Sequence, residues 1–323
     1  MLFRVKKALP AVFFLFILLF GAGCGYEPDT SAPQRTDIDR SPDWRGALLY
    51  IADRDGPTEG FGSVRVYDNV SGFVEMTVEQ TRAAAPSDLY ITSEGSSMYV
   101  ASSANGLIDK FRWDGNSWIR GTFDIETPSS SLDALAAGPD GRLYAVDATP
   151  GGGAGRLFVL DPQTDQVGDD PLVIPALASV SGISWSSDGA AAYVAGKAAG
   201  TGTSVLLILS WPSGQVAGSI DLLTDDTRHV ATSPDGRFVF IMGRGEILKT
   251  DPSSGTVIGS LKPDPGAAIQ YTGGDFSADG RFLFVTGTDP GGGNLYVIDL
   301  ETEAVVNTVN QISRQAGGIQ RVK

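Results

Sequence analysis

The hydrophobic positions of this chain fall in short runs with the spacing of β-strands. Beyond residue 47, aromatic and branched aliphatic residues occur in brief stretches such as Leu143–Val146 and Leu295–Ile298, bounded by Gly, Pro, Asp and Ser. No stretch between them carries the helical period of an amphipathic α-helix. The pattern therefore predicts an all-β domain.

A polar corner recurs ahead of one strand in every repeat. Its acidic residues are 46, 48, 47 and 44 positions apart, and an aromatic-aliphatic strand follows each corner. Two more strands complete the unit, and a further run precedes the corner. Four short strands in a unit of this length predict one blade of a β-propeller, which cannot bury its apolar face alone. The corners are Ser93-Glu94-Gly95, Pro139-Asp140-Gly141, Ser187-Asp188-Gly189, Pro234-Asp235-Gly236 and Ala278-Asp279-Gly280.

The two ends of the repeat region complete each other. Residues 48–52, 62–68 and 72–78 match the second to fourth strands of a blade that lacks an opening strand. Residues 317–322 match an opening strand with nothing after it. The sequence thus predicts a six-bladed β-propeller of four-stranded blades, with the first blade closed by the C-terminal strand. Such closure leaves no unpaired radial edge at which chains could aggregate.

These repeats resemble a known type. A unit such as Ser233–Arg237, followed by an aromatic-rich strand, a strand ending in Asp and a Thr/Ser-Gly turn, is similar to the YVTN repeats of lactonase-like and surface-layer-like propellers. The resemblance covers residues 46–323, although Ser93–Gly95 lacks the Pro and Asp, and Ser210–Pro212 replaces the strand-ending Asp. It implies the fold. It implies no single function, because that superfamily includes both binding scaffolds and enzymes.

The N-terminus has the layout of an export signal. A positive stretch precedes the ten apolar residues 11–20, which suit a secretory signal and are too few to span a bilayer. We predict a signal peptide over residues 1–23. Residues 24–45 are polar and proline-bearing, which predicts a flexible tether. Residues 46–323 remain as a single propeller domain.

The end of this signal resembles a bacterial lipobox. It reads Gly21-Ala22-Gly23-Cys24, with Gly21 where the motif usually has Leu. The resemblance implies that Cys24 becomes the lipidated first residue of a mature envelope lipoprotein. By the same resemblance, Gly25 favours sorting to the outer membrane, facing the periplasm or the cell surface. An ordinary signal peptide with an incidental cysteine is the alternative, although a lone cysteine in an exported protein has no disulfide partner.

Charge limits the partners. The net charge of −14 becomes −17 once the signal segment, which carries three basic and no acidic residues, is removed. Such a chain repels phosphate backbones, so nucleic-acid binding is not expected. Membrane association is expected to come from the acyl chains rather than from attraction to anionic lipid. The remaining partner classes are another envelope protein and a small ligand.

Motifs for catalysis and cofactor binding are missing from the sequence. There is no Gly-x-Ser-x-Gly, His-Glu-x-x-His, Cys-x-x-Cys or Walker motif. His229 is the only histidine, which rules out a three-histidine zinc site, and a lipidated Cys24 leaves no thiol for nucleophilic chemistry. We assign no catalytic residue and expect no cofactor.

Propeller topology indicates where a binding site would lie. The loops between second and third strands, and those between blades, share one face, here called the loop face; the polar corners lie on the opposite corner face. The loop-face segments are long and irregular, as binding loops on a rigid scaffold often are. Candidate ligand or partner residues are Asp53, Asp55, Asp147 and Asp289 on these loops, and Asp88, Asp133, Arg228 and His229 near the entrances of the opening strands. Alternatively, these charges are solvated or pair with one another, as Asp133 and Arg228 would.

Two functions remain open at this point. In the first, a lipid-anchored envelope propeller acts as a binding scaffold through its loop face. In the second, it is an envelope hydrolase or lactonase-like enzyme whose carboxylates, at Asp53, Asp133, Asp147 and Asp289, hold a divalent cation that activates water. The enzyme needs at least three of these carboxylates to converge on one point. The missing motifs favour the scaffold.

Overall fold

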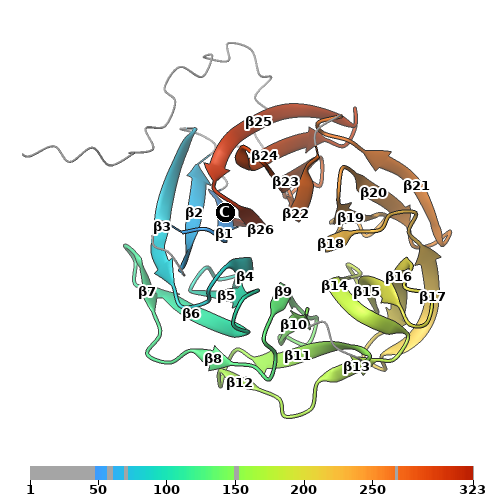
Figure 1. The fold of residues 1–323 in the computed structure, drawn as a ribbon, viewed down its shortest axis with the longest axis horizontal. Helices are drawn as coiled ribbons and strands as arrows, with labels where there is room; N and C mark the ends of the chain where they lie inside the picture. Colours follow the sequence, from blue (N-terminus) through green and yellow to red (C-terminus); the bar gives the residue numbers. More distant parts are fainter. Residues whose placement is uncertain (1–47, 57–60, 69–71, 149–152, 266–267, 323) are drawn as a thin grey trace, which may run out of the picture. The chain divides into compact units, whose positions relative to one another are not determined.

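The strands form six antiparallel sheets that follow one another in a ring, with the first strand of each sheet nearest the centre (Figure 1). The computed structural model describes residues 48–56, 61–68, 72–148, 153–265 and 268–322. The expected signal peptide (1–23), Cys24 and the tether (24–45) lie outside the described residues. Within the described part there is no helix, and consequently no helix that could cross a membrane.

Each blade is ordered from the channel outward, and the first three blades are as follows. The first contains β26 (Ala316–Val322), β1 (Leu48–Asp53), β2 (Gly62–Asp68) and β3 (Phe73–Thr81). The second contains β4 (Pro86–Ile91), β5 (Ser97–Ser102), β6 (Leu107–Trp113) and an outer strand in two pieces, β7 (Trp118–Arg120) and β8 (Ile125–Glu126). The third contains β9 (Leu132–Ala137), β10 (Leu143–Asp147), β11 (Gly155–Asp161) and another divided outer strand, β12 (Gln166–Val167) and β13 (Leu172–Ile174).

The last three blades have undivided outer strands. The fourth contains β14 (Leu177–Trp185), β15 (Ala191–Ala198), β16 (Ser204–Ser210) and β17 (Gln215–Asp221). The fifth contains β18 (Thr227–Thr232), β19 (Val239–Gly243), β20 (Ile247–Asp251) and β21 (Thr256–Leu261). The sixth contains β22 (Gln270–Phe276), β23 (Phe282–Asp289), β24 (Gly292–Asp299) and β25 (Ala304–Ser313).

The C-terminal strand closes the ring. β26 pairs antiparallel with β1, in a register that places Ile319 opposite Ile51. It also receives a bond from the sixth blade, because the Thr272 hydroxyl donates to the Ala316 carbonyl at 2.9 Å. The predicted six-bladed all-β propeller, with its first blade completed by the C-terminal strand, is therefore confirmed.

The polar corners are structural turns. In the fifth blade, Gly236 has a φ of +70°, a conformation that favours glycine. The Asp235 carboxylate accepts bonds from the Ser233 hydroxyl at 2.6 Å and from the Arg237 amide at 3.0 Å. Asp140, Asp188 and Asp279 also accept a backbone amide two residues further on. The regular spacing of the sequence thus reports the turn between the first two strands of the second to sixth blades, while the first blade pairs β1 with β26 without such a turn.

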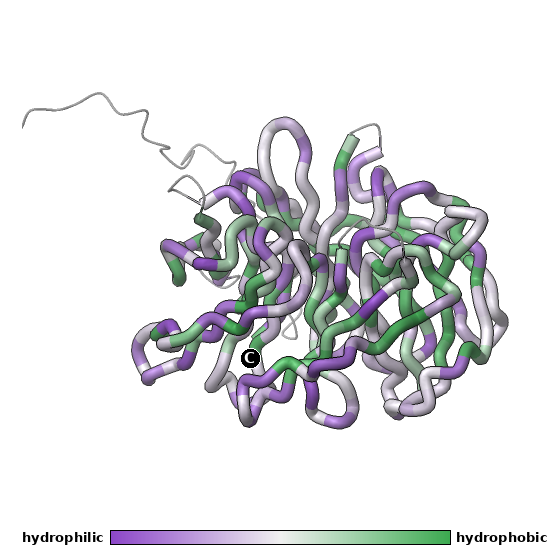
Figure 2. The backbone as a smooth tube through the Cα atoms, turned by 60° about the horizontal axis from the view of Figure 1, so that its bottom comes forward, coloured by the Kyte–Doolittle hydropathy of each residue, from purple (hydrophilic) through white to green (hydrophobic). Residues whose placement is uncertain are grey.

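The core lies between the blades, and Figure 2 shows hydrophobic stretches along the strands with hydrophilic ones at the turns. The repeated aromatic that follows each corner is buried there, and Tyr99, Phe240 and Phe284 are at most 1% exposed. Trp113 and Trp118 are paired across the β6–β7 hairpin, with ring centroids 5.3 Å apart. These two indole rings therefore pack edge-to-face across the hairpin.

One loop-face segment differs from expectation. Residues 287–294, expected to be a long irregular loop, are largely paired: Gly287 lies opposite Asn294 and Asp289 opposite Gly292. The glycines allow neighbouring segments to approach this hairpin closely, because an added Cβ would lie 2.7 Å from Cγ2 of Ile269 at Gly287 and 2.7 Å from the Ala316 nitrogen at Gly293.

Candidate functional site

Every inner strand carries an irregularity near its loop-face end. The register between first and second strands shifts between Pro86 and Asp88 in β4, between Thr227 and His229 in β18 and between Tyr271 and Gly273 in β22. Equivalent shifts occur in the other three blades. A β-bulge of this kind redirects the side chain of the extra residue. Here it sets which side chains meet at the channel mouth.

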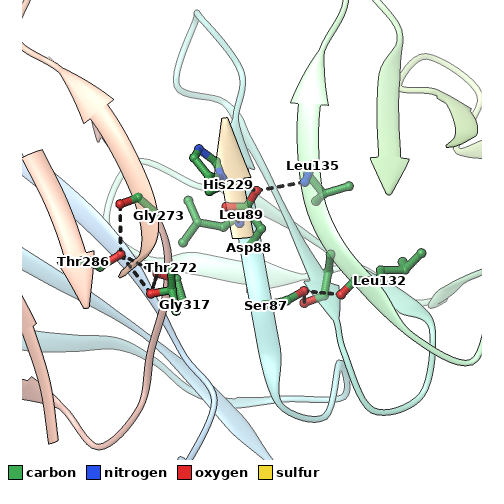
Figure 3. Close-up of polar contacts among 11 residues, drawn as sticks. Ser87, Asp88, Leu89, Leu132, Leu135, His229, Thr272, Gly273, Thr286 and Gly317 are labelled. Carbon is green, nitrogen blue, oxygen red and sulfur yellow. Dashed lines mark hydrogen bonds and ion pairs between the residues drawn. The ribbon is translucent and has the colours of Figure 1, made fainter. Parts of the chain in front are cut away.

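The residues at this bulge alternate in character around the ring. In the second, fourth and sixth blades they are hydroxyl residues that bond to the next inner strand. Ser87 donates to the Leu132 carbonyl (2.5 Å), Ser181 shares a bond with the Thr227 hydroxyl (2.7 Å), and Thr272 donates to the Ala316 carbonyl (2.9 Å). Figure 3 shows two of these bonding residues, Ser87 and Thr272. The hydroxyls therefore fasten neighbouring blades together.

In the third and fifth blades the bulge carries a charged residue instead. These are Asp133 and Arg228, which the sequence analysis placed at the channel entrance. The first blade has Gly317 at this position, which carries no charge. Its charged residue is Arg54, which directly follows β1, the second strand of that blade. The charges of Arg54, Asp133 and Arg228 act on one another. Alternate blades therefore contribute a mixed-charge group, here called the mouth cluster.

Asp53 holds Arg54 in place. Its carboxylate is fully buried and forms an ion pair with Arg65 across the β1–β2 hairpin, with an Nε–Oδ2 distance of 2.8 Å. The other oxygen accepts the Gln315 amide at 3.2 Å, and the Arg54 amide donates to the Gln315 carbonyl at 2.9 Å. Asp53, expected on an exposed loop, is consequently a buried support rather than a ligand-facing group.

Within the mouth cluster the charges are unevenly paired. Arg228 forms an ion pair with Asp226 at 2.9 Å, and Gln270 donates to the same carboxylate at 3.0 Å. Arg228 therefore pairs with Asp226 and not, as one alternative expected, with Asp133. Burial lowers the pKa of Arg54 from its ordinary value, opposed by the charge of Asp133. Burial likewise raises the pKa of Asp133, opposed by the charges of Arg54 and Arg228.

A cavity of about 190 Å³ lies in the channel beyond the mouth cluster. All six inner strands line it with residues from their middle and later parts, so it extends toward the corner face. Asp88 lies at the end of the cavity nearer the loop face. Its two carboxylate oxygens accept hydrogen bonds from the amides of Leu89 and Leu135, both at 2.9 Å. Burial raises the pKa of Asp88 to about 7, against these two bonds and the charge of Arg54.

His229 lies beside Asp88 (Figure 3), with 3.9 Å between Nδ1 and the nearer carboxylate oxygen. Burial lowers the pKa of His229 to about 4, so the imidazole is uncharged at neutral pH and this contact is not an ion pair there. Asp275 also lines the cavity, and burial raises its pKa, opposed by the backbone bonds it accepts from Arg321 and Phe276. The interior therefore holds two carboxyl groups and a neutral imidazole.

The other predicted residues are separated from this cluster. Asp147 is buried, contrary to the expected loop exposure, and forms an ion pair with Arg156 at 2.5 Å across the β10–β11 hairpin. Asp289 accepts a bond from Asn294 at 3.0 Å within its own turn, and Asp55 is exposed. Among the residues that the structure describes, no three His, Cys, Asp or Glu side chains are grouped to hold a metal ion.

Three residues of the mouth cluster and the cavity were not predicted from the sequence: Arg54, Asp226 and Asp275. Arg54 and Asp226 belong to connecting segments, and only the ring geometry brings them to the axis. Asp275 was detectable in principle. It is opposite Phe284, the repeated aromatic of its blade, at the level where other blades place Ala136, Ser184 and Ala231. The second blade has Tyr90 and the first Gln320 at this level, so a charge at a position that is neutral in the other five blades is the signal that aligned repeats would have given.

No protein family is matched by this sequence, and no curated protein matches it. Solved structures are similar in fold. A proposed 6-phosphogluconolactonase from Bacteroides fragilis is 14% identical with a TM-score of 0.60, covering 88% of this chain and 100% of that chain. A protein of unknown function from Desulfotomaculum acetoxidans is 15% identical with a TM-score of 0.58, covering 85% of this chain and 98% of that chain.

A further match is hydrazine synthase of Kuenenia stuttgartiensis, at 19% identity and a TM-score of 0.53. It covers 69% of this chain and 65% of that chain, so the present chain spans about two thirds of it. These likenesses, which include lactonase-like propellers, show the β-propeller fold and no more. Function has to be argued from the site.

Proposed function

We propose that this protein is a lipid-anchored β-propeller of the cell envelope that acts as a binding scaffold through its loop face. The lipid attaches at Cys24, and residues 24–45 act as the tether between membrane and ring. The anchor rests on the lipobox-like sequence. The binding face rests on the arrangement of side chains around the channel mouth.

One observation carries the choice of a scaffold over a metal-dependent hydrolase. Three of the four carboxylates that would hold the metal are engaged separately, each within its own blade, and the Asp289 carboxylate accepts its bond from Asn294. Asp53 pairs with Arg65 in the first blade, and Asp147 pairs with Arg156 in the third. An arginine within hydrogen-bond distance neutralises a carboxylate and stiffens the hairpin that carries it. These pairs therefore hold the described strand ends of the two hairpins in a fixed geometry at the loop face, which supports a role in recognition.

The loop face also exposes an apolar side chain suited to a contact with a protein. Leu223, in the connection between the fourth and fifth blades, is 90% exposed. Leu222 beside it is buried, so the connection is anchored while Leu223 projects. Val216, at the start of β17 near the corner face, is 53% exposed and offers a matched apolar control. Substitution at either position should change stability by no more than about 0.5 kcal/mol.

The test is affinity purification of the full-length lipidated protein from cells, comparing wild type, Leu223→Ser and Val216→Ser. We expect a specific envelope protein to accompany the wild type and the Val216→Ser variant and to be lost with Leu223→Ser. Recovery of the partner at equal yield from all three proteins would contradict a loop-face scaffold. So would the absence of any specific partner.

A second candidate is hydrolysis of a lactone or ester in the channel. It is favoured by Asp88, whose pKa of about 7 suits a general base and whose carboxyl faces the cavity beside His229. Two similar structures are proposed 6-phosphogluconolactonases. Lactone hydrolysis by the purified protein that is lost in Asp88→Asn, together with no partner in the purification, would replace the scaffold with this enzyme.

A further inference from the structure

The mouth cluster contains two opposite charges without a close partner. The Nε of Arg54 is buried and has no hydrogen-bond partner among the described residues. Arg54 and Asp133 influence each other electrostatically, yet neither forms a salt bridge with a described residue, whereas Arg228 is paired with Asp226 at 2.9 Å. Both side chains are half-buried, and a charge that is partly removed from water without a contacting counter-ion is destabilising, so the arrangement favours a bound group that contacts both.

The position of these charges suits a ligand that enters from the loop face. Arg54 comes from the first blade and Asp133 from the third, and the bulge directs Asp133 toward the channel. Asp88, which acts on both charges, belongs to the second blade between them and also lines the cavity of about 190 Å³. A small molecule held at the mouth could therefore extend past Asp88 into the channel.

Charge selects the class of ligand. A net charge of −14 disfavours the approach of an anion to this protein, and the Arg54 guanidinium disfavours a simple cation at the mouth. A neutral molecule with one positive and one negative group avoids both penalties. Its carboxylate would accept hydrogen bonds from Arg54, and its ammonium would donate to Asp133.

We propose that the channel mouth between Arg54 and Asp133 binds a small zwitterion with an ammonium and a carboxylate on one carbon, which is the class of free α-amino acids. This inference rests on the proposed function, since it takes the loop face as the binding face. It adds a small-molecule site to the protein contact at Leu223.

The test is calorimetric titration of the purified propeller with three molecules of similar size. L-Alanine carries both charged groups, propionate lacks the ammonium, and ethylammonium lacks the carboxylate. We expect L-alanine to bind at least about tenfold more tightly than either, equivalent to about 1.4 kcal/mol. Equal binding of propionate or ethylammonium, or no measurable binding of L-alanine, would overturn the proposal.

Substitutions locate the site. Arg54→Gln and Asp133→Asn should each weaken L-alanine binding about tenfold or more, whereas Arg314→Gln, which removes an exposed loop-face arginine, should leave it unchanged. Thermal melts show whether each variant is folded, and the three-ligand comparison on the wild type stands if one is not. Failure of these titrations with successful partner capture through Leu223 would remove the zwitterion site and leave the scaffold intact.

Discussion

Replacing Gly318 with alanine tests how the C-terminal strand fits against the channel site. An added Cβ would lie 1.6 Å from Oδ1 and 2.5 Å from Cγ of Asp88, so the carboxylate would have to move. That movement would break its bonds with the amides of Leu89 and Leu135, both 2.9 Å long. Each buried amide left without a partner costs about 1–3 kcal/mol, so we expect a loss of about 2–6 kcal/mol in unfolding free energy.

Urea denaturation followed by tryptophan fluorescence measures this loss. Gly259→Ala is the matched control, because an added Cβ there meets no atom within 4 Å. That substitution should be neutral or stabilising by up to about 1 kcal/mol. In a background of Asp88→Ala, the Gly318→Ala substitution should cost less than it does alone, because the carboxylate it strikes is gone. Equal stability of Gly318→Ala and Gly259→Ala would show that Gly318 of β26 does not pack against the Asp88 carboxylate of β4.

Three further predictions concern closure, ionisation and anchoring. Deleting residues 316–323 removes the partner of β1 and the acceptors of Thr272, so the melting temperature should fall far more than for any surface substitution; a melt within a few degrees of the full-length protein would refute closure. Because the pKa of Asp88 is raised from 3.8 to about 7, its contribution to stability is present below pH 4 and lost as pH rises to 7. Urea titrations at pH 4 and pH 8 should therefore show that the wild type loses roughly 4 kcal/mol of unfolding free energy relative to Asp88→Asn between the two pH values. A difference between the two proteins that does not change with pH would contradict the burial of this charge. Cys24→Ser should abolish labelling by a fatty-acid analogue and release the protein from membranes, whereas unchanged labelling would exclude the lipoprotein proposal.

The fold could be predicted from sequence because its determinants are local and repeated. All five corners have a Gly at positive φ, and in four of them an Asp accepts the amide two residues further on, so the spacing of corners counts blades. The incomplete blade at the N-terminus and the spare strand at the C-terminus then required closure. The divided outer strands of the second and third blades were not foreseen, because strands at the rim face solvent and carry a weak hydrophobic pattern.

The site was only partly predictable because its pairing is not local. Asp53 and Asp147 each end the second strand of a blade, and each forms an ion pair with an arginine in the third strand of that blade. Arg65 pairs with Asp53, and Arg156 pairs with Asp147. That recurrence in two blades was visible in the sequence and would have indicated structural ion pairs. The placement of Arg54 at the axis was not visible, since it depends on a connection between the termini of the ring.

Site-specific photo-crosslinking in intact cells tests the central claim, that the loop face is the binding face. A photoreactive amino acid replaces Leu223 on the loop face in one protein and Val216 near the corner face in another, both with the native lipid anchor. We expect a discrete adduct with one envelope protein from position 223 and none from position 216. An adduct from position 216 alone, or no adduct from position 223, would contradict it.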